Sequence, residues 1–303
     1  GPSARRHLFF LLCLSAFDAA LAARRWFQPE VFQSATDFAS LRSMNPLLVY
    51  AQGAGFGLRG PLAQDPCQDT LGMAYSGFMD VSSPDERPHY PPGSMSDVLT
   101  GTNLASAVMA GLLRRSVSGR GGLVGTSQVQ SLLWLTNQAV GIASSIGETM
   151  KRFSIDQPPN ALMTPYETAD GWVAVAVIHP DQWPALASAI GLDELLDDAR
   201  FTRFGHALKN TDALLPILQE RFRERTTDEW WRVLRDAGVW AGPVNRVQDL
   251  AQDPHVLANE YLVTFPDGFV GPPAPYEVDG WRGSRGVAAE YGEHTDEVLS
   301  EVL

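Results

Sequence analysis

The sequence predicts an α/β protein with two domains. Its 303 residues are 45% hydrophobic and 19% charged, which is typical of a globular chain large enough for two domains or for one large α/β domain. Short apolar segments at 46–51 and 171–177 read as strands, and they alternate with longer segments in which apolar residues recur at helical spacing. The proline-rich Gln157-Pro158-Pro159 between them indicates a domain boundary.

The first predicted strand leads into a glycine-rich turn at 55–60. Gly55-Phe56-Gly57-Leu58-Arg59-Gly60 matches the G-x-G-x-x-G pattern of dinucleotide-binding loops. That pattern requires a helix that begins in the loop and holds the pyrophosphate at its amino terminus. Pro61 and Pro66 bracket a segment without apolar periodicity. The sequence therefore favours a strand followed by a wide glycine turn over a dinucleotide site.

The remaining elements follow from periodicity and from residues that end helices. In the first half we expect a helix of small residues at 69–80 ending at Gly77, a loop at 82–94, a helix from Asp97 to Arg115, a turn at 118–122, a strand at 123–126 and a long helix at 127–150. In the second half we expect the strand at 171–177, helices at 180–190, 208–225 and 227–237, a strand at 239–244, and helices at 247–258 and 290–303. Thr226 or Thr227 is expected to cap the helix at 227–237.

Charge and cysteine content exclude several classes of function. With 35 acidic and 23 basic residues the net charge is −12, which disfavours binding to nucleic acid or to an anionic membrane. Cys13 and Cys67 are the only cysteines, so neither a disulfide framework nor a cysteine-based metal site is expected, and no metal is predicted. A reducing, cytoplasmic location fits this composition.

Residues 5–22 admit two interpretations. Arginines, an apolar run and small residues follow one another as they do in a secretory signal. Alternatively, the segment forms a buried helix. We favour the helix because Asp18 fits poorly near a cleavage site, and the stretch is short for a membrane span.

Asp97 is the strongest candidate for a catalytic residue, and it also has two interpretations. Aspartate is among the best amino-terminal capping residues, so it could simply cap the helix that follows. A carboxylate at a helix amino terminus is also kept ionised by the helix dipole, and it can then act as a nucleophile near neutral pH. The residue type and position alone leave both roles open.

A set of motifs resembles the family III CoA-transferases in order and spacing. That family includes formyl-CoA and carnitine CoA-transferases and the α-methylacyl-CoA racemases. The resemblance covers residues 26–303 and rests on Asn45-Pro46-Leu47-Leu48-Val49-Tyr50, Gly55-Phe56-Gly57 with Gly60-Pro61, Ser76-Gly77, Ser96-Asp97 with Thr100-Gly101, Ser118-Gly119-Arg120-Gly121, residues 165–172 and Gly292-Glu293-His294-Thr295.

The resemblance implies a mechanism and a site. Asp97 would attack an acyl-CoA thioester to give a mixed anhydride, and CoA would then form an aspartyl thioester that an acceptor carboxylic acid attacks. CoA and acyl-CoA would be substrates, and no bound cofactor is implied. Candidate contacts of substrate or CoA are Gln52, Gly53, Gly55, Phe56, Asp69 and Tyr166.

The resemblance also implies an assembly. The expected fold is an incomplete doubly wound large domain at 1–159, a smaller α+β domain at 160–275, and a tail at 276–303 that returns to the large domain. Family members form interlaced dimers, so we expect a homodimer in which Tyr166 contacts the substrate.

Two departures from the family pattern leave alternatives open. Gln68 stands where the racemases have a histidine base, which disfavours racemisation by that scheme. The family's amino-terminal strands are missing, and residues 26–31 alter its "NFRPG" element. A partner chain could supply that region. The alternatives are therefore an inactive paralogue that acts as a subunit or binding protein, or another acyl-CoA enzyme such as a racemase, isomerase or lyase.

Overall fold

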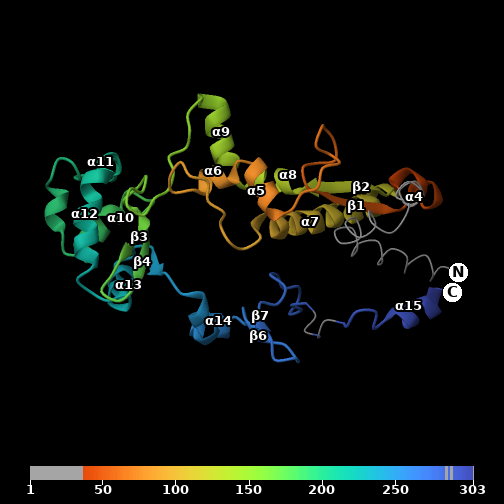
Figure 1. Cartoon of the computed structure of the whole chain (residues 1–303). Coiled ribbons are helices and arrows are strands. Elements are labelled where there is room, and N and C mark those ends of the chain that lie inside the picture. Colours follow the sequence, from red (N-terminus) through yellow and green to blue (C-terminus); the bar gives the residue numbers. More distant parts are fainter. Residues whose placement is uncertain (1–36, 284–285, 287–288, 303) are drawn as a thin grey trace. The chain divides into compact units, whose positions relative to one another are not determined.

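A computed structural model describes residues 37–283, 286 and 289–302 (Figure 1). The chain divides into two compact units, the first ending at Ser154 and the second beginning at Ile155. This break lies close to the predicted boundary at 159. The return of residues 276–303 to the first domain stays a prediction. The signal-like segment 5–22 and Cys13 lie outside the described residues.

The first unit is built on two parallel strands, β1 (Val49–Ala54) and β2 (Gly122–Ser127), which pair in register along their whole length. Both predicted strands are thus confirmed, with β1 shifted towards the glycine turn. The long helix α7 (Met95–Ser118) packs against both strands. A Cβ at Gly111 of α7 would lie 2.9 Å from Cγ1 of Val49 and from Cγ1 of Val124. As the small residues predicted, glycine here lets the helix lie directly on the strands.

Five shorter helices lie in the described part of the first unit, and two boundaries differ from expectation. Helix α5 ends before Gly77, whose φ of 78° is left-handed, and the unforeseen α6 follows it. The single helix expected at 127–150 is two helices separated at Thr136. The backbone of Thr136, at φ −92° and ψ 19°, departs from helical values, and α8 ends there. The five are α4 (Phe38–Met44), α5 (Asp69–Tyr75), α6 (Phe78–Ser82), α8 (Gln128–Leu135) and α9 (Asn137–Ile146).

The second unit has its own hydrophobic core beneath an antiparallel sheet. The strands are β3 (Met163–Glu167), β4 (Trp172–Ala176) and β5 (Ala241–Pro243), in that order, so the strand predicted at 171–177 is confirmed. The side chains of Trp183, Phe222 and Trp230 are fully buried in this core. The surrounding helices are α10 (Gln182–Ala189), η1 (Asp193–Leu196), α11 (Phe204–Lys209), α12 (Thr211–Phe222) and α13 (Thr227–Asp236).

Capping residues set several helix boundaries in the second unit. Thr226, one of the two predicted caps, caps α13, and it forms a capping box with Glu229. The helix expected at 247–258 is instead η2 (Val247–Gln252) followed by α14 (Pro254–Ala258), because Asp253 caps a new helix that starts with proline. The last described elements are β6 (Val263–Thr264), β7 (Val270–Gly271) and α15 (Thr295–Val302). Among the described residues, no helix is both long and apolar enough to cross a bilayer.

Candidate active site around Asp97

Asp97 lies where ligand sites form in parallel α/β sheets. Helix α7 ends just before β2 begins, and it packs along both strands, so its first turn lies at their carboxyl edge. Substrates of open parallel sheets bind outside that edge. Asp97 is in the first turn of α7, and its side chain is exposed to solvent.

The structure assigns the capping role to Asp69 rather than to Asp97. The residue at the amino-terminal cap position of α7 is Ser94, whose side chain makes no capping hydrogen bond. Instead, Oδ1 of Asp69 accepts from the backbone N–H of Ser96 at 2.8 Å and of Asp97 at 3.2 Å. The capping interpretation of Asp97 is therefore wrong, and the role of Asp69, which the sequence left open, is to hold the first turn of α7.

Tyr90 holds the other oxygen of the Asp69 carboxylate. Its hydroxyl donates to Oδ2 of Asp69 at 2.9 Å, and this bond to a carboxylate raises the pKa of Tyr90. The Asp69 side chain is only 7% exposed. Both of its oxygens are thus occupied by donors, which makes it a structural carboxylate rather than a base facing solvent.

Gln128 is the direct partner of the Asp97 side chain. It is the first residue of α8, it is fully buried, and its Nε2 donates to Oδ1 of Asp97. No other hydrogen bond to the Asp97 carboxylate occurs within the part of the chain that the structure describes. One oxygen is therefore held, while the other has no hydrogen-bond partner among the described residues. Sequence reasoning missed Gln128, because no motif signals a contact made 31 positions away.

The glycine turn after β1 lies beside this cluster. No helix begins between Gly55 and Gln68, which agrees with the rejection of a dinucleotide loop. A Cβ at Gly55 would lie 2.0 Å from the Cβ of Cys67, so only glycine allows the two ends of the loop to approach. Burial, and the nearby negative charge of Asp97, raise the pKa of the Cys67 thiol. This coupling places the loop close to Asp97.

Three further predicted contacts lie at the same edge. Gln52 is exposed in the carboxyl half of β1, and Gly53 beside it is half-buried. The ring of Phe56 packs edge-on against Tyr75 of α5, with centroids 5.2 Å apart. The structure therefore gathers Gln52, Gly53, Gly55, Phe56 and Asp69 around the edge that carries Asp97.

Tyr166 is placed differently. It is fully buried in the core of the second unit, where its ring stacks on Phe222 and its hydroxyl donates to the Ala161 carbonyl. Burial raises its pKa far above the ordinary value. These contacts are those of a core residue, so the predicted contact between Tyr166 and substrate has no support in the described geometry.

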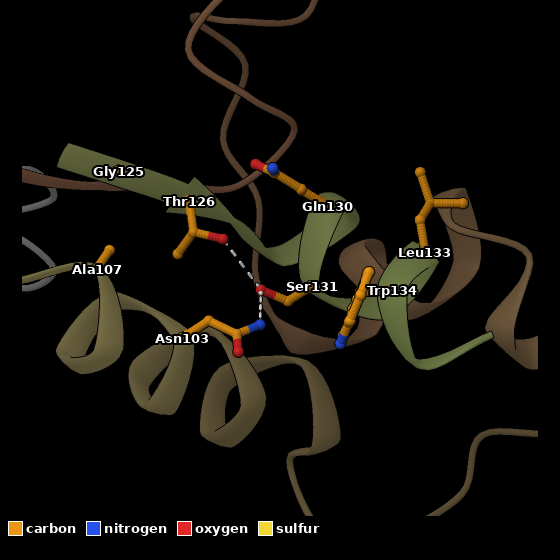
Figure 2. A pocket seen from close by; sticks show the side chains of 8 residues that line it. All are labelled: Asn103, Ala107, Gly125, Thr126, Gln130, Ser131, Leu133 and Trp134. Atoms are coloured by element: carbon orange, nitrogen blue, oxygen red, sulfur yellow. Dashed lines mark hydrogen bonds between the residues drawn. The ribbon is translucent and has the colours of Figure 1, made fainter. Parts of the chain in front are cut away.

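A pocket of about 490 Å³ is lined by residues of α7, β2 and α8 (Figure 2). Among these residues, Nδ2 of Asn103 donates to Oγ of Ser131 at 3.0 Å, and the hydroxyls of Ser131 and Thr126 lie 3.2 Å apart. None of its lining residues carries a carboxylate, thiol or imidazole. Within the described residues, no cluster of three histidine, cysteine, aspartate or glutamate side chains could hold a metal ion. The pocket therefore carries no ionisable group comparable to the Asp97 carboxylate.

The chain is similar in sequence to CoA-transferases of known activity. The chain is 27% identical over 281 residues to human succinyl-CoA:glutarate CoA-transferase, covering 88% of this chain and 62% of that protein. It is 30% identical over 278 residues to succinate–glutarate CoA-transferase from Agrobacterium fabrum, covering 88% and 68%. The chain thus spans less than two thirds of the length of its human relative.

A solved structure and a family profile agree with these relatives. The crystal structure of a CaiB/BaiF family protein from Brucella suis superimposes with a TM-score of 0.75 at 27% identity, covering 90% of this chain and 73% of that one. The profile of CoA-transferase family III matches residues 18–295. The expected α/β fold of that family is therefore confirmed, and the chain belongs to CoA-transferase family III.

Proposed function

We propose that this chain transfers CoA from an acyl-CoA to a carboxylic acid, with Asp97 as the nucleophile. The observation that carries the proposal is the contrast between two neighbouring carboxylates. Asp97 is exposed at the carboxyl edge of the parallel strands, whereas Asp69 is buried and hydrogen-bonded through both oxygens. Only Asp97 is available for attack, and the activities named for the relatives are CoA transfers between acids.

The chemistry divides one acyl exchange into four steps. An oxygen of Asp97 attacks the thioester carbonyl, and collapse of the tetrahedral intermediate expels CoA thiolate and leaves a mixed anhydride. The thiolate attacks Cγ of Asp97, forming an aspartyl thioester and releasing the donor acid as its carboxylate. The acceptor carboxylate attacks Cγ in turn, and expelled CoA thiolate then attacks the acceptor carbonyl of the new anhydride. That last step forms the product thioester and restores the Asp97 carboxylate.

The geometry disfavours a racemase on the same site. Racemisation needs a pair of bases that remove and return an α-proton. Gln68 is exposed at the start of α5, and its amide cannot act as a base. Asp69 accepts from two backbone N–H groups and from Tyr90, so it has no oxygen poised towards a substrate.

Trapping the covalent intermediate tests the proposal. The protein is incubated with succinyl-CoA, the donor named for its human relative, and then with hydroxylamine, and Asp97 is examined by peptide mass spectrometry. A hydroxamate at Asp97 is the expected result. Asp97→Asn removes the nucleophile and is expected to lower CoA exchange by roughly 10³-fold or more.

A matched control and a binding measurement separate the alternatives. Asp85→Asn removes an exposed carboxylate from the loop at 83–94 and should leave exchange unchanged. An unmodified Asp97 across a panel of acyl-CoA donors would refute the proposed chemistry. If such a protein still bound CoA in calorimetry, it would instead be a CoA-binding protein without transferase activity.

A further inference from the structure

Gln128 is a buried polar residue whose side chain makes a hydrogen bond to Asp97. An apolar residue could fill the same space without that bond. Its side chain is fully buried between α7 and α5, and a Cβ at Gly72 of α5 would lie 2.9 Å from the Cβ of Gln128. Glycine at 72 therefore makes room for Gln128 at the start of α8. The amide that fills this room reaches Oδ1 of Asp97 through Nε2.

The other end of the same amide is unsatisfied. Within the described residues, Oε1 of Gln128 is buried and has no hydrogen-bond partner, and the hydroxyls of Ser96 and Thr100 on α7 share this condition. An unpaired buried acceptor is destabilising, and a leucine of similar size would avoid it. The stability of the fold therefore does not explain why residue 128 is a glutamine. The hydrogen bond from its amide to Asp97 does explain it.

The position of Nε2 matters most once Asp97 carries an acyl or CoA group. In the proposed mechanism, one Asp97 oxygen forms the new bond and the other becomes a carbonyl oxygen. Oδ1 is held by Gln128, so Oδ2, which accepts no hydrogen bond from the described residues, is the oxygen that attacks. Oδ1 is then the oxygen on which negative charge develops when Cγ is attacked. A fixed N–H aimed at such an oxygen stabilises the transition state.

We propose that Gln128 is the oxyanion donor for the two steps in which Cγ of Asp97 is attacked. When CoA thiolate adds to Cγ of the mixed anhydride, the carbonyl electron pair moves onto Oδ1, beside Nε2 of Gln128. Collapse restores the carbonyl, breaks the bond from Cγ to the acyl-bearing oxygen and releases the donor carboxylate. Attack by the acceptor carboxylate on the aspartyl thioester uses the same donor and expels thiolate. This role rests on the proposed function of Asp97.

The assignment predicts an effect confined to these steps. Gln128→Leu removes the donor and the unpaired acceptor together, and Gln128→Met also removes the donor while keeping the length of the side chain. In a single turnover with succinyl-CoA and no acceptor acid, both variants should still acylate Asp97. Release of succinate should slow by roughly 100-fold, as is typical for loss of one oxyanion donor. The adduct on Asp97 should then accumulate as the succinyl anhydride rather than as the CoA thioester, which intact-mass analysis distinguishes.

Gln130→Leu is the matched control. Gln130 lies two residues further along α8, is exposed and lines the pocket of Figure 2, so the same substitution there should leave both steps unchanged. Thermal unfolding of each variant identifies any loss of folded protein, and the methionine variant keeps the test valid if the leucine variant does not fold.

The results separate this role from the proposed function. If acylation and succinate release slow by the same factor in the Gln128 variants, the oxyanion role is overturned and Gln128 has only a packing role. Normal release in both variants would also overturn it. If the wild-type protein forms no adduct at Asp97 with any acyl-CoA, the proposed function itself fails, and the role of Gln128 fails with it.

Discussion

Cys67 provides a measure of the charge on Asp97 that does not depend on any substrate. Its thiol is partly buried next to the glycine turn, and burial raises its pKa, with a further increase from the negative charge of Asp97. Because a raised pKa lowers the fraction of reactive thiolate at a given pH, the thiol reacts slowly with alkylating agents. The rate of this reaction therefore reports whether Asp97 is ionised and near.

Removing the charge of Asp97 should accelerate alkylation of Cys67. In Asp97→Asn the charge contribution disappears while burial remains, so the pKa of Cys67 falls part of the way towards its ordinary value. At pH 8, below that value, iodoacetamide should modify Cys67 faster than in the wild type, because a larger fraction of the thiol is ionised. Peptide mass spectrometry measures Cys67 separately from Cys13. Asp85→Asn should have no effect, and equal rates in all three proteins would contradict the proximity of Cys67 and Asp97.

At the residue scale, the sequence was informative about Asp97 but not about its surroundings. The spacing of Ser96-Asp97 and Thr100-Gly101 pointed to Asp97 through the family pattern. The actions of Asp69 and Gln128 on Asp97 depend on how α5 and α8 fold against α7, which no local pattern encodes. Capping propensity even favoured the wrong aspartate, because a cap can come from a residue 28 positions away in the chain.

Helix α7 both packs against the strands and holds Asp97 in its first turn. Gly111 lies against β1 and β2, whereas a Cβ at Gly101, one turn after Asp97, would meet no atom within 4 Å. Alanine has a higher helix propensity than glycine, so the two positions should respond in opposite ways to the same substitution. The difference in stability between the two variants therefore measures the contact between α7 and the strands at Gly111.

We expect Gly101→Ala to stabilise the protein by about 0.5–1 kcal/mol, because it removes backbone freedom from the unfolded chain. Gly111→Ala should destabilise it by about 1–3 kcal/mol, because the new methyl group lies too close to Val49 and Val124. Urea denaturation followed by circular dichroism measures both changes. Stabilisation by both substitutions would show that α7 lies farther from the strands than the structure places it.

The elements that sequence predicted well are those with a strong period or a clear cap. The helix from Asp97 and the strand at 171–177 are long or uniformly apolar, and Thr226 with Glu229 forms a recognisable capping box. The predicted helix at 127–150 was wrong because its apolar residues continue past Thr136, where the backbone departs from helical values and the helix divides in two. Such a break depends on the backbone angles of one residue, which periodicity does not reveal.

At the scale of the whole molecule, the two units differ in how they cover their apolar residues. The second unit has the continuous buried core described above. Within its described residues, the first has a sheet of two parallel strands, and parallel sheets are normally covered on both faces. Its helix α7 exposes a row of apolar side chains at intervals of four residues: Met109, Leu113 and Val117 are 70%, 67% and 82% exposed. An uncovered row of this kind is typical of an interface.

We therefore predict that the row on α7 takes part in the homodimer that the family resemblance implies. The purified protein should sediment as a dimer at micromolar concentration, and Leu113→Glu should shift it towards monomer by placing a charge in the apolar row. Val247→Glu is the matched control, because Val247 in the second unit is 84% exposed yet lies outside this row. Analytical ultracentrifugation over a concentration series distinguishes the three proteins. A wild-type protein that remains monomeric throughout would refute the dimer, and equal dissociation by both substitutions would show that α7 is not its interface.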